Sequence, residues 1–278
     1  MKKKTIRGLS EIYHKYDTFY VDLWGVVHNG IHLNSGAIDV LHNLYKLNKK
    51  FILMSNAPRP AENVKNFLLK MKMDKIFIKN VFTSGEAALI SLKKKIYGEN
   101  FYHLGPERDR DLFRGLEKNS KMLKDADFIL CTGFLDKREN SLNFYKNFLK
   151  NYTQIKMICT NPDFIVYRGP IKEYCAGTLA RIFEELGGKV IYFGKPHPEI
   201  YNFCMKKNEK ILAIGDNIRT DIKGANNMKF DSLFITGGIH KSEFIDLKVD
   251  DYDKILENYK VKTNYYQEEL TWWKYEDF

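Results

Sequence analysis

The stretch Tyr20-Val-Asp-Leu-Trp-Gly-Val-Val-His-Asn-Gly30 contains the pattern that decides the fold of this chain. Its apolar start predicts a buried strand over Phe19–Val27, and the carboxylate of Asp22 has little structural reason to stand inside such a strand. Similar apolar runs predict eight more strands further along the chain. These strands span residues 51–55, 80–83, 101–104, 128–131, 156–159, 190–193, 211–214 and 232–235.

Amphipathic stretches between these runs predict helices. They span residues 35–47, 61–71, 85–97, 141–152, 178–186, 199–206 and 220–228, with Ser35 and Ser84 as candidate N-caps. Strands and helices that alternate at this spacing are typical of an α/β fold, in which helices cover both faces of a parallel sheet.

Composition limits the class of protein. A length of 278 residues with 44% hydrophobic residues suits one or two globular domains. No apolar run reaches the roughly 18 residues of a membrane-spanning helix, and the charged N-terminus lacks the apolar segment of a secretion signal. The four cysteines (131, 159, 175 and 204) lie far apart, which indicates reduced thiols in a cytoplasmic protein.

The net charge of +10 is unevenly distributed. Ten acids and five lysines between Glu243 and Phe278 leave +15 on the first 242 residues. A basic surface favours anionic partners such as phosphorylated metabolites, nucleic acid or an acidic membrane. No block of five or six consecutive basic residues occurs, so a solvated surface is the simpler interpretation, and a nucleic-acid or membrane partner is not expected.

Four predicted strands end in polar clusters rather than in plain turns. In doubly wound sheets the functional site lies beyond the carboxyl ends of the strands, where such loops converge. We therefore expect one crevice that collects a side chain from every cluster. These side chains are Asp22, Ser55, Lys195, Asp216 and Asp221.

Carboxylates beside a hydroxyl and a lysine suit Mg²⁺-assisted phosphoryl transfer, because Mg²⁺ prefers oxygen ligands. Lys195 and backbone N–H groups would neutralise the phosphoryl oxygens. A carboxylate can attack phosphorus and form an aspartyl-phosphate that water then cleaves, and Asp22 is the candidate nucleophile. An N-cap role for Asp216 is the structural alternative.

The polar clusters also carry a resemblance. Asp22, Ser55-Asn56, Gly194-Lys-Pro196 and Gly215-Asp216 with Thr220-Asp221 resemble, in this order, the four motifs of the haloacid dehalogenase (HAD) phosphatase superfamily. Its subclass IIA includes nucleotide and 4-nitrophenylphosphatase-type enzymes. The segments that resemble this subclass are Thr83-Ser-Gly-Glu-Ala87, Thr160-Asn-Pro-Asp163, Gly177-Thr178 and Gly194-Lys-Pro-His-Pro198.

The resemblance covers about residues 17–240 and implies a Rossmann-like parallel-sheet core with an inserted α/β cap domain. The implied division is 1–90 for the first part of the core, 91–188 for the cap, and 189–278 for the second part with an aromatic, acidic C-terminal run. We expect the run from Asn264 to Phe278 to pack on the core, with a homodimer contact as the alternative.

The resemblance also implies roles for individual residues. Asp22 would be nucleophile and Mg²⁺ ligand, with the backbone carbonyl of Trp24 as a second ligand. Asp216 and Asp221 would also be metal ligands, the latter directly or through water. Ser55, the Asn56 backbone and Lys195 would be phosphate ligands. Asn161 and Asp163 would help to select the substrate where the cap meets the core.

Trp24 departs from the D-x-D pattern of the superfamily's first motif, in which the second Asp protonates the leaving group. Indole has no useful pKa, so it cannot act as a general acid or base, a role worth roughly 10²–10⁴-fold in rate. The stretch matches a D-x-W-G-V-x-H-x-G subset of the subclass. His28 could replace the missing acid or could hydrogen-bond a neighbouring loop, and the Trp24 ring could contact substrate or pack under the cap.

These observations predict a Mg²⁺-dependent phosphatase of a small phosphomonoester, such as a sugar phosphate, a nucleotide or a phosphorylated cofactor. The reaction would be slow, or would favour substrates with good leaving groups, because of Trp24. A protein that binds a phosphorylated metabolite without turnover is the alternative, and transfer of the phosphoryl group to an acceptor other than water stays open.

Overall fold

The computed structural model describes residues 5–138 and 141–273, which form two compact units. Unit 1 contains Met1–Ser55, Phe67–Phe82 and Cys204–Phe278, and unit 2 contains Asn56–Asn66 and Thr83–Phe203. The division at residues 90 and 188 stays a prediction, because a compact unit need not coincide with an inserted domain.

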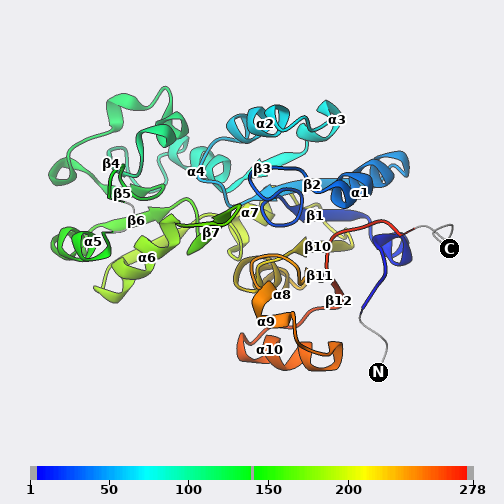
Figure 1. The fold of residues 1–278 in the computed structure, drawn as a ribbon. Helices are drawn as coiled ribbons and strands as arrows, with labels where there is room; N and C mark the ends of the chain where they lie inside the picture. The colour runs from blue at the N-terminus through cyan, green and yellow to red at the C-terminus, as the bar shows by residue number, and fades with distance from the viewer. Residues whose placement is uncertain (1–4, 139–140, 274–278) are drawn as a thin grey trace. The chain divides into compact units, whose positions relative to one another are not determined.

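Unit 1 is built on a six-stranded sheet with the order β12-β11-β10-β1-β2-β3 (Figure 1). Strand β1 pairs in parallel with both β2 and β10, so that Thr18 lies beside Lys50 and Ile211. The strands are β1 (Thr18–Asp22), β2 (Lys50–Ser55), β3 (Val81–Thr83), β10 (Ile211–Gly215), β11 (Asp231–Ile235) and β12 (Tyr265–Gln267).

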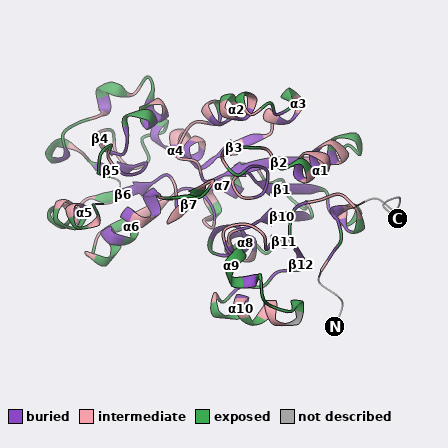
Figure 2. Cartoon of the chain, in the orientation of Figure 1, coloured by how far each residue is buried: buried purple, intermediate pink, exposed green. Residues whose placement is uncertain are grey.

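Every residue of β1 and β10 is buried, as Figure 2 shows. Strands that are covered on both faces read as continuous apolar runs in the sequence, which is why both were predictable. The helices of this unit are α1 (Ser35–Lys46), α3 (Lys75–Ile78), α8 (Lys223–Met228), α9 (Lys241–Phe244) and α10 (Tyr252–Asn258). Helix α2 (Ala61–Lys70) belongs to this unit from Phe67 onward.

Unit 2 has its own parallel sheet with the order β4-β5-β6-β9, together with the antiparallel pair β7 and β8. Its strands are β4 (Phe101–Leu104), β5 (Phe128–Cys131), β6 (Lys156–Cys159), β7 (Ile165–Arg168), β8 (Ile171–Tyr174) and β9 (Lys189–Tyr192). Its helices are α4 (Ser84–Lys93), α5 (Leu142–Leu149), α6 (Ala176–Glu185) and α7 (Pro198–Asn202).

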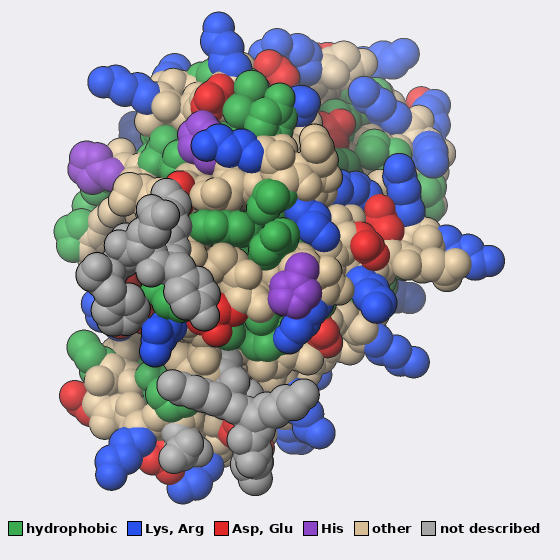
Figure 3. Space-filling view, turned by 90° about the vertical axis from the view of Figure 1, so that its right-hand side faces the viewer, with side chains coloured by type: hydrophobic (Ala, Val, Ile, Leu, Met, Phe, Trp, Pro, Cys, Tyr) green, Lys and Arg blue, Asp and Glu red, His purple; other side chains and the backbone are tan. Residues whose placement is uncertain are grey.

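Lys and Arg side chains are spread over the face of the molecule that Figure 3 shows, with acidic side chains among them. On this face, the mixture favours a solvated surface rather than a continuous basic groove for nucleic acid. Among the described residues, no helix has the length and apolar character that crossing a bilayer requires.

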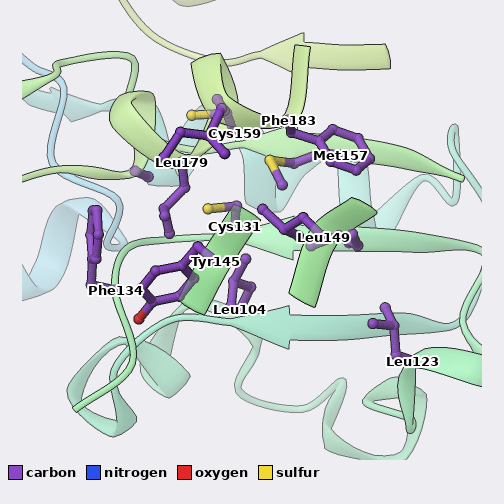
Figure 4. Packing of buried hydrophobic residues seen from close by; sticks show 14 residues of the cluster. Leu104, Leu123, Cys131, Phe134, Tyr145, Leu149, Met157, Cys159, Leu179 and Phe183 are labelled. Carbon is purple, nitrogen blue, oxygen red and sulfur yellow. The ribbon is translucent and has the colours of Figure 1, made fainter. Parts of the chain in front are cut away.

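Helices α5 and α6 pack on the sheet of unit 2 and enclose its core (Figure 4). The Tyr145 ring lies 5.0 Å from that of Phe134 between centroids, and its hydroxyl accepts a hydrogen bond from the Leu135 N–H at 2.8 Å. All four cysteines are free thiols, and burial raises the pKa of Cys131 to about 12. The core is therefore closed without a disulfide, as the cysteine spacing predicted.

Several sequence-based boundaries were wrong. The first strand ends at Asp22 rather than at Val27, because the chain then turns and Leu23 O accepts hydrogen bonds from the N–H groups of Val27 and His28. The helix predicted over 220–228 begins at Lys223, and a π-helical turn over Ile218–Ile222 precedes it. The helices predicted over 85–97, 141–152 and 199–206 are shorter than expected.

The predicted N-caps were one residue late. Asn34 precedes α1, and Thr83 precedes α4 with its hydroxyl accepting a hydrogen bond from the Glu86 N–H at 3.0 Å. Ser35 and Ser84 are therefore the first residues of their helices.

Three strands were missed, namely β7, β8 and β12. Strands β7 and β8 lack a buried apolar run, and β12 has only three residues. Because β12 pairs with β11 and Thr271 O accepts a hydrogen bond from the Leu9 N–H at 2.9 Å, the C-terminal run packs on unit 1 as expected. Residues 274–278 of that run lie outside the described residues.

Candidate active site

Three carboxylates meet at one edge of the unit 1 sheet. Asp22 ends β1, Asp216 follows β10 directly, and Asp221 lies in the π-helical turn beyond it. One oxygen atom from each lies within 4.8 Å of the other two. Because β1 and β10 are parallel neighbours with Val21 beside Ile214, their carboxyl ends bring Asp22 and Asp216 to the same edge.

These carboxylates are 8%, 3% and 3% exposed for Asp22, Asp216 and Asp221 respectively. Three buried negative charges at this separation repel one another, and a cation between them relieves both the repulsion and the cost of burial. An all-oxygen donor set of this kind fits a hard divalent cation such as Mg²⁺.

Two glycines allow Asp216 to approach the backbone closely. Gly25 has a φ of +91°, and a Cβ atom there would lie 2.1 Å from Asp216 Oδ2. A Cβ atom at Gly238 would lie 2.0 Å from the same oxygen, which also accepts a hydrogen bond from the Ile239 N–H at 2.7 Å. The Asp216 carboxylate is thus held by two chain segments that can carry no side chain at the contact.

The N-cap alternative for Asp216 is wrong. Asn217 precedes the π-helical turn, and its Oδ1 accepts a hydrogen bond from the Arg219 N–H at 2.9 Å. Asp221 Oδ2 accepts a hydrogen bond from the Asn217 N–H at 3.1 Å. A short amide side chain therefore caps the turn, whereas the flanking carboxylates point into the acidic cluster.

Gly238→Ala is expected to displace Asp216 and to weaken Mg²⁺ binding by at least about tenfold, because a methyl group cannot share space with the carboxylate. The measurement is the rise in unfolding temperature of wild type and variant over a Mg²⁺ titration. Gly133→Ala is the matched control, since a Cβ atom there meets its nearest neighbour at 3.4 Å. An unchanged Mg²⁺ response in a folded Gly238→Ala variant would contradict this account of the acidic cluster.

Trp24 and His28 lock the loop that follows β1. Their ring centroids lie 5.0 Å apart in an edge-on arrangement, and the Gly30 N–H donates a hydrogen bond to His28 Nδ1 at 3.0 Å. The Gly25 N–H donates to the backbone oxygen of His28 at 2.8 Å, and a Cβ atom at Gly30 would lie 2.7 Å from the Trp24 ring. The W-G-x-x-H-x-G spacing is thus explained by local packing.

His28 is buried, and its Nδ1 accepts a hydrogen bond from the loop backbone. A neutral imidazole in this arrangement carries its proton on Nε2. The arrangement matches the interpretation of His28 as a loop residue that hydrogen-bonds its neighbours.

Asn56, Asp163 and Lys195 form a second group of predicted residues, in unit 2. Asn56 Oδ1 accepts a hydrogen bond from the Lys195 N–H at 2.8 Å, and its Nδ2 donates to Lys195 O at 3.0 Å and to Asp163 Oδ1 at 3.1 Å. Asn161 Oδ1 accepts a hydrogen bond from the Asp163 N–H at 3.0 Å. All four residues carried a sequence prediction, but the part played by the Asn56 side chain was missed.

The structure therefore divides the predicted residues between its two units. Unit 1 holds Asp22, Trp24, His28, Ser55, Asp216 and Asp221, and unit 2 holds Asn56, Asn161, Asp163 and Lys195. Ser55 is buried at the end of β2, one residue beyond Met54, the neighbour of Asp22 across the sheet. The convergence of both groups in a single crevice stays a prediction.

Comparison with known proteins gives two family matches. Residues 19–118 match a model described as haloacid dehalogenase-like hydrolase, and residues 192–260 match one described as HAD-hydrolase-like. The matched stretches contain Asp22, Ser55, Lys195, Asp216 and Asp221.

Individual relatives cover most of the chain. A hydrolase of the haloacid dehalogenase-like family from Brucella suis 1330 is 29% identical, with a TM-score of 0.81 over 96% of this chain and 100% of that one. Ribonucleotide monophosphatase NagD of Escherichia coli K12 is 23% identical over 218 residues, 76% of this chain and 84% of that protein. A 4-nitrophenylphosphatase from Thermotoga maritima shares the fold, with a TM-score of 0.70 at 22% identity over 92% of this chain and 95% of that one.

Proposed function

This chain belongs to the haloacid dehalogenase-like hydrolases, among the phosphatases of subclass IIA, and from that premise we propose that it is a Mg²⁺-dependent phosphatase of small phosphomonoesters. The observation that carries the proposal is the cluster of Asp22, Asp216 and Asp221. Burying several carboxylates together is costly, and a bound cation that also contacts a phosphate would offset that cost.

In the proposed reaction, a carboxylate oxygen of Asp22 attacks phosphorus, and the bond between phosphorus and the ester oxygen breaks. The ester oxygen leaves with the bonding electron pair and takes its proton from water, because Trp24 has none to give. Water then attacks the aspartyl-phosphate at phosphorus, which releases inorganic phosphate and restores the Asp22 carboxylate. Bound Mg²⁺ supplies positive charge that stabilises the phosphoryl oxygens. Asp22, Asp216, Asp221 and the carbonyl of Trp24 would hold it.

The phosphate ligands in this proposal are the Ser55 hydroxyl, the Asn56 backbone N–H and the Lys195 ammonium. They neutralise and orient the phosphoryl group, which is the main contribution that a protein makes to phosphoryl transfer. Asn161 and Asp163 would contact the rest of the substrate. The name of one relative, ribonucleotide monophosphatase NagD, supports a nucleotide as the substrate, and a sugar phosphate or a phosphorylated cofactor is included in the proposal as a further small phosphomonoester.

Slow turnover is part of the proposal, because Trp24 provides no proton for the leaving group. The same residue favours a second candidate function, the binding of a phosphorylated metabolite without turnover. We also propose a cytoplasmic location, which the four free thiols support.

Phosphate release from a panel of phosphomonoesters tests the proposal. With Mg²⁺, we expect release from 4-nitrophenyl phosphate, whose leaving group needs no protonation, and slower release from nucleotides and sugar phosphates. Chelation of Mg²⁺ should stop the reaction. A ligand-induced rise in unfolding temperature without release of phosphate from any ester would favour the binding protein instead.

A further inference from the structure

The side chain of Asn56 joins chain segments that are far apart in the sequence. Lys195 lies 139 residues away and Asp163 lies 107 residues away, yet both bond to this one amide. The amide accepts a hydrogen bond from the Lys195 N–H and donates one to the Lys195 carbonyl, so it grips both sides of that residue's backbone. At 5% exposure Asn56 is shielded from competing water.

Ser84 completes the arrangement from a fourth segment. Its buried hydroxyl lies within hydrogen-bond distance of Thr160 O, at 2.6 Å, and of Phe193 O. Ser84 therefore contacts both the segment that leads to Asp163 and the segment that leads to Lys195. Gly194 lies between the side chains of Asn56 and Ser84 with a φ of +109°, and a Cβ atom there would lie 2.7 Å from both Asn56 Oδ1 and Ser84 Oγ. A side chain at position 194 would therefore push these two side chains apart.

We propose that the Asn56 side chain is a positioning residue that orients Lys195 for phosphate and couples it to Asp163. The inference rests on the proposed function, in which Lys195 is a phosphate ligand. A lysine has a long flexible side chain, so it contributes most to phosphate binding when its backbone is held in one place. Because Asp163 and Lys195 share one amide, a substrate group that moves Asp163 acts directly on the hydrogen bonds of Lys195.

Asn56→Ala removes the hydrogen bonds that this amide makes to Lys195 and Asp163. It is expected to weaken the binding of inorganic phosphate, measured by calorimetry with Mg²⁺, by about tenfold, and to lower kcat/KM by at least as much. Asn63→Ala is the matched control, because Asn63 lies in the same segment and donates an amide–carboxylate hydrogen bond to Asp111 at 2.9 Å, away from the motif residues. This control should leave both quantities unchanged.

Positioning is separated from a structural role by a double-mutant cycle. In a Lys195→Ala background, Asn56→Ala should weaken phosphate binding by less than about twofold, because the group that it positions is gone. An equal effect in both backgrounds would overturn the inference. Unfolding temperatures of all variants check that each one folds.

A charge swap tests the link to Asp163. Asn56→Asp should lower the affinity for phosphate more than Asn56→Ala does, because it places a second carboxylate against Asp163 and cannot donate to Lys195 O. Adding Asp163→Asn restores a donor and an acceptor at that contact and should recover part of the lost phosphate affinity. If the swap recovers nothing, the coupling to Asp163 is refuted. If wild type neither binds phosphate nor releases it from any ester, the proposed function fails instead, and this inference fails with it.

Discussion

Asp22→Asn is expected to reduce phosphate release by on the order of 10⁴-fold or more, because a carboxamide is a poor nucleophile toward phosphorus. The substitution preserves the size of the side chain at the end of β1, so the sheet should not change. Steady-state phosphate release in the presence of Mg²⁺ is the measurement, with the best ester of the substrate panel.

The control for this variant is stability. Removing one of three mutually repelling carboxylates should leave the unfolding temperature without Mg²⁺ unchanged or higher, while the stabilisation by Mg²⁺ decreases. Asp17→Asn is a matched variant beyond the other end of the same strand, where Asp17 accepts a hydrogen bond from the Lys210 N–H at 2.9 Å. It should keep full turnover. A folded Asp22→Asn protein with normal turnover would refute the nucleophile assignment.

Trp24→Asp is expected to raise turnover by roughly 10²–10⁴-fold, the usual contribution of a general acid and base. The gain should be largest for a sugar phosphate, whose alkoxide leaving group requires a proton, and smallest for 4-nitrophenyl phosphate. The ratio of kcat/KM for these two esters is therefore the measurement that isolates proton transfer. Loss of the contacts with His28 and Gly30 should cost some stability.

Trp24→Asn is the matched control, because it loses the same ring contacts and gains no titratable group. It should not change the ratio between the two esters. If Trp24→Asp folds and still gives no gain, then another residue already supplies the proton. The paired variant His28→Gln would then show whether that residue is His28.

The sequence by itself indicated which strands end in the polar residues of the candidate site. Strands β1, β2 and β10 are continuous apolar runs followed at once by polar residues, and parallel strands place their carboxyl ends at one edge. Asp22, Asp216 and Asp221 could therefore be grouped from the sequence pattern alone. The cause is local, since burial on both faces imprints itself on consecutive residues.

Only the tertiary structure decided what holds these groups in place. The close approach of Gly238 to Asp216 joins residues whose contact a periodic sequence pattern cannot predict. The same holds for the hydrogen bonds of Asn56 with Lys195 and Asp163. The end of β1 at Asp22 likewise depends on hydrogen bonds made by the following loop. A sequence pattern records which face of an element is buried, whereas the partner of a buried polar group is chosen by how distant segments pack.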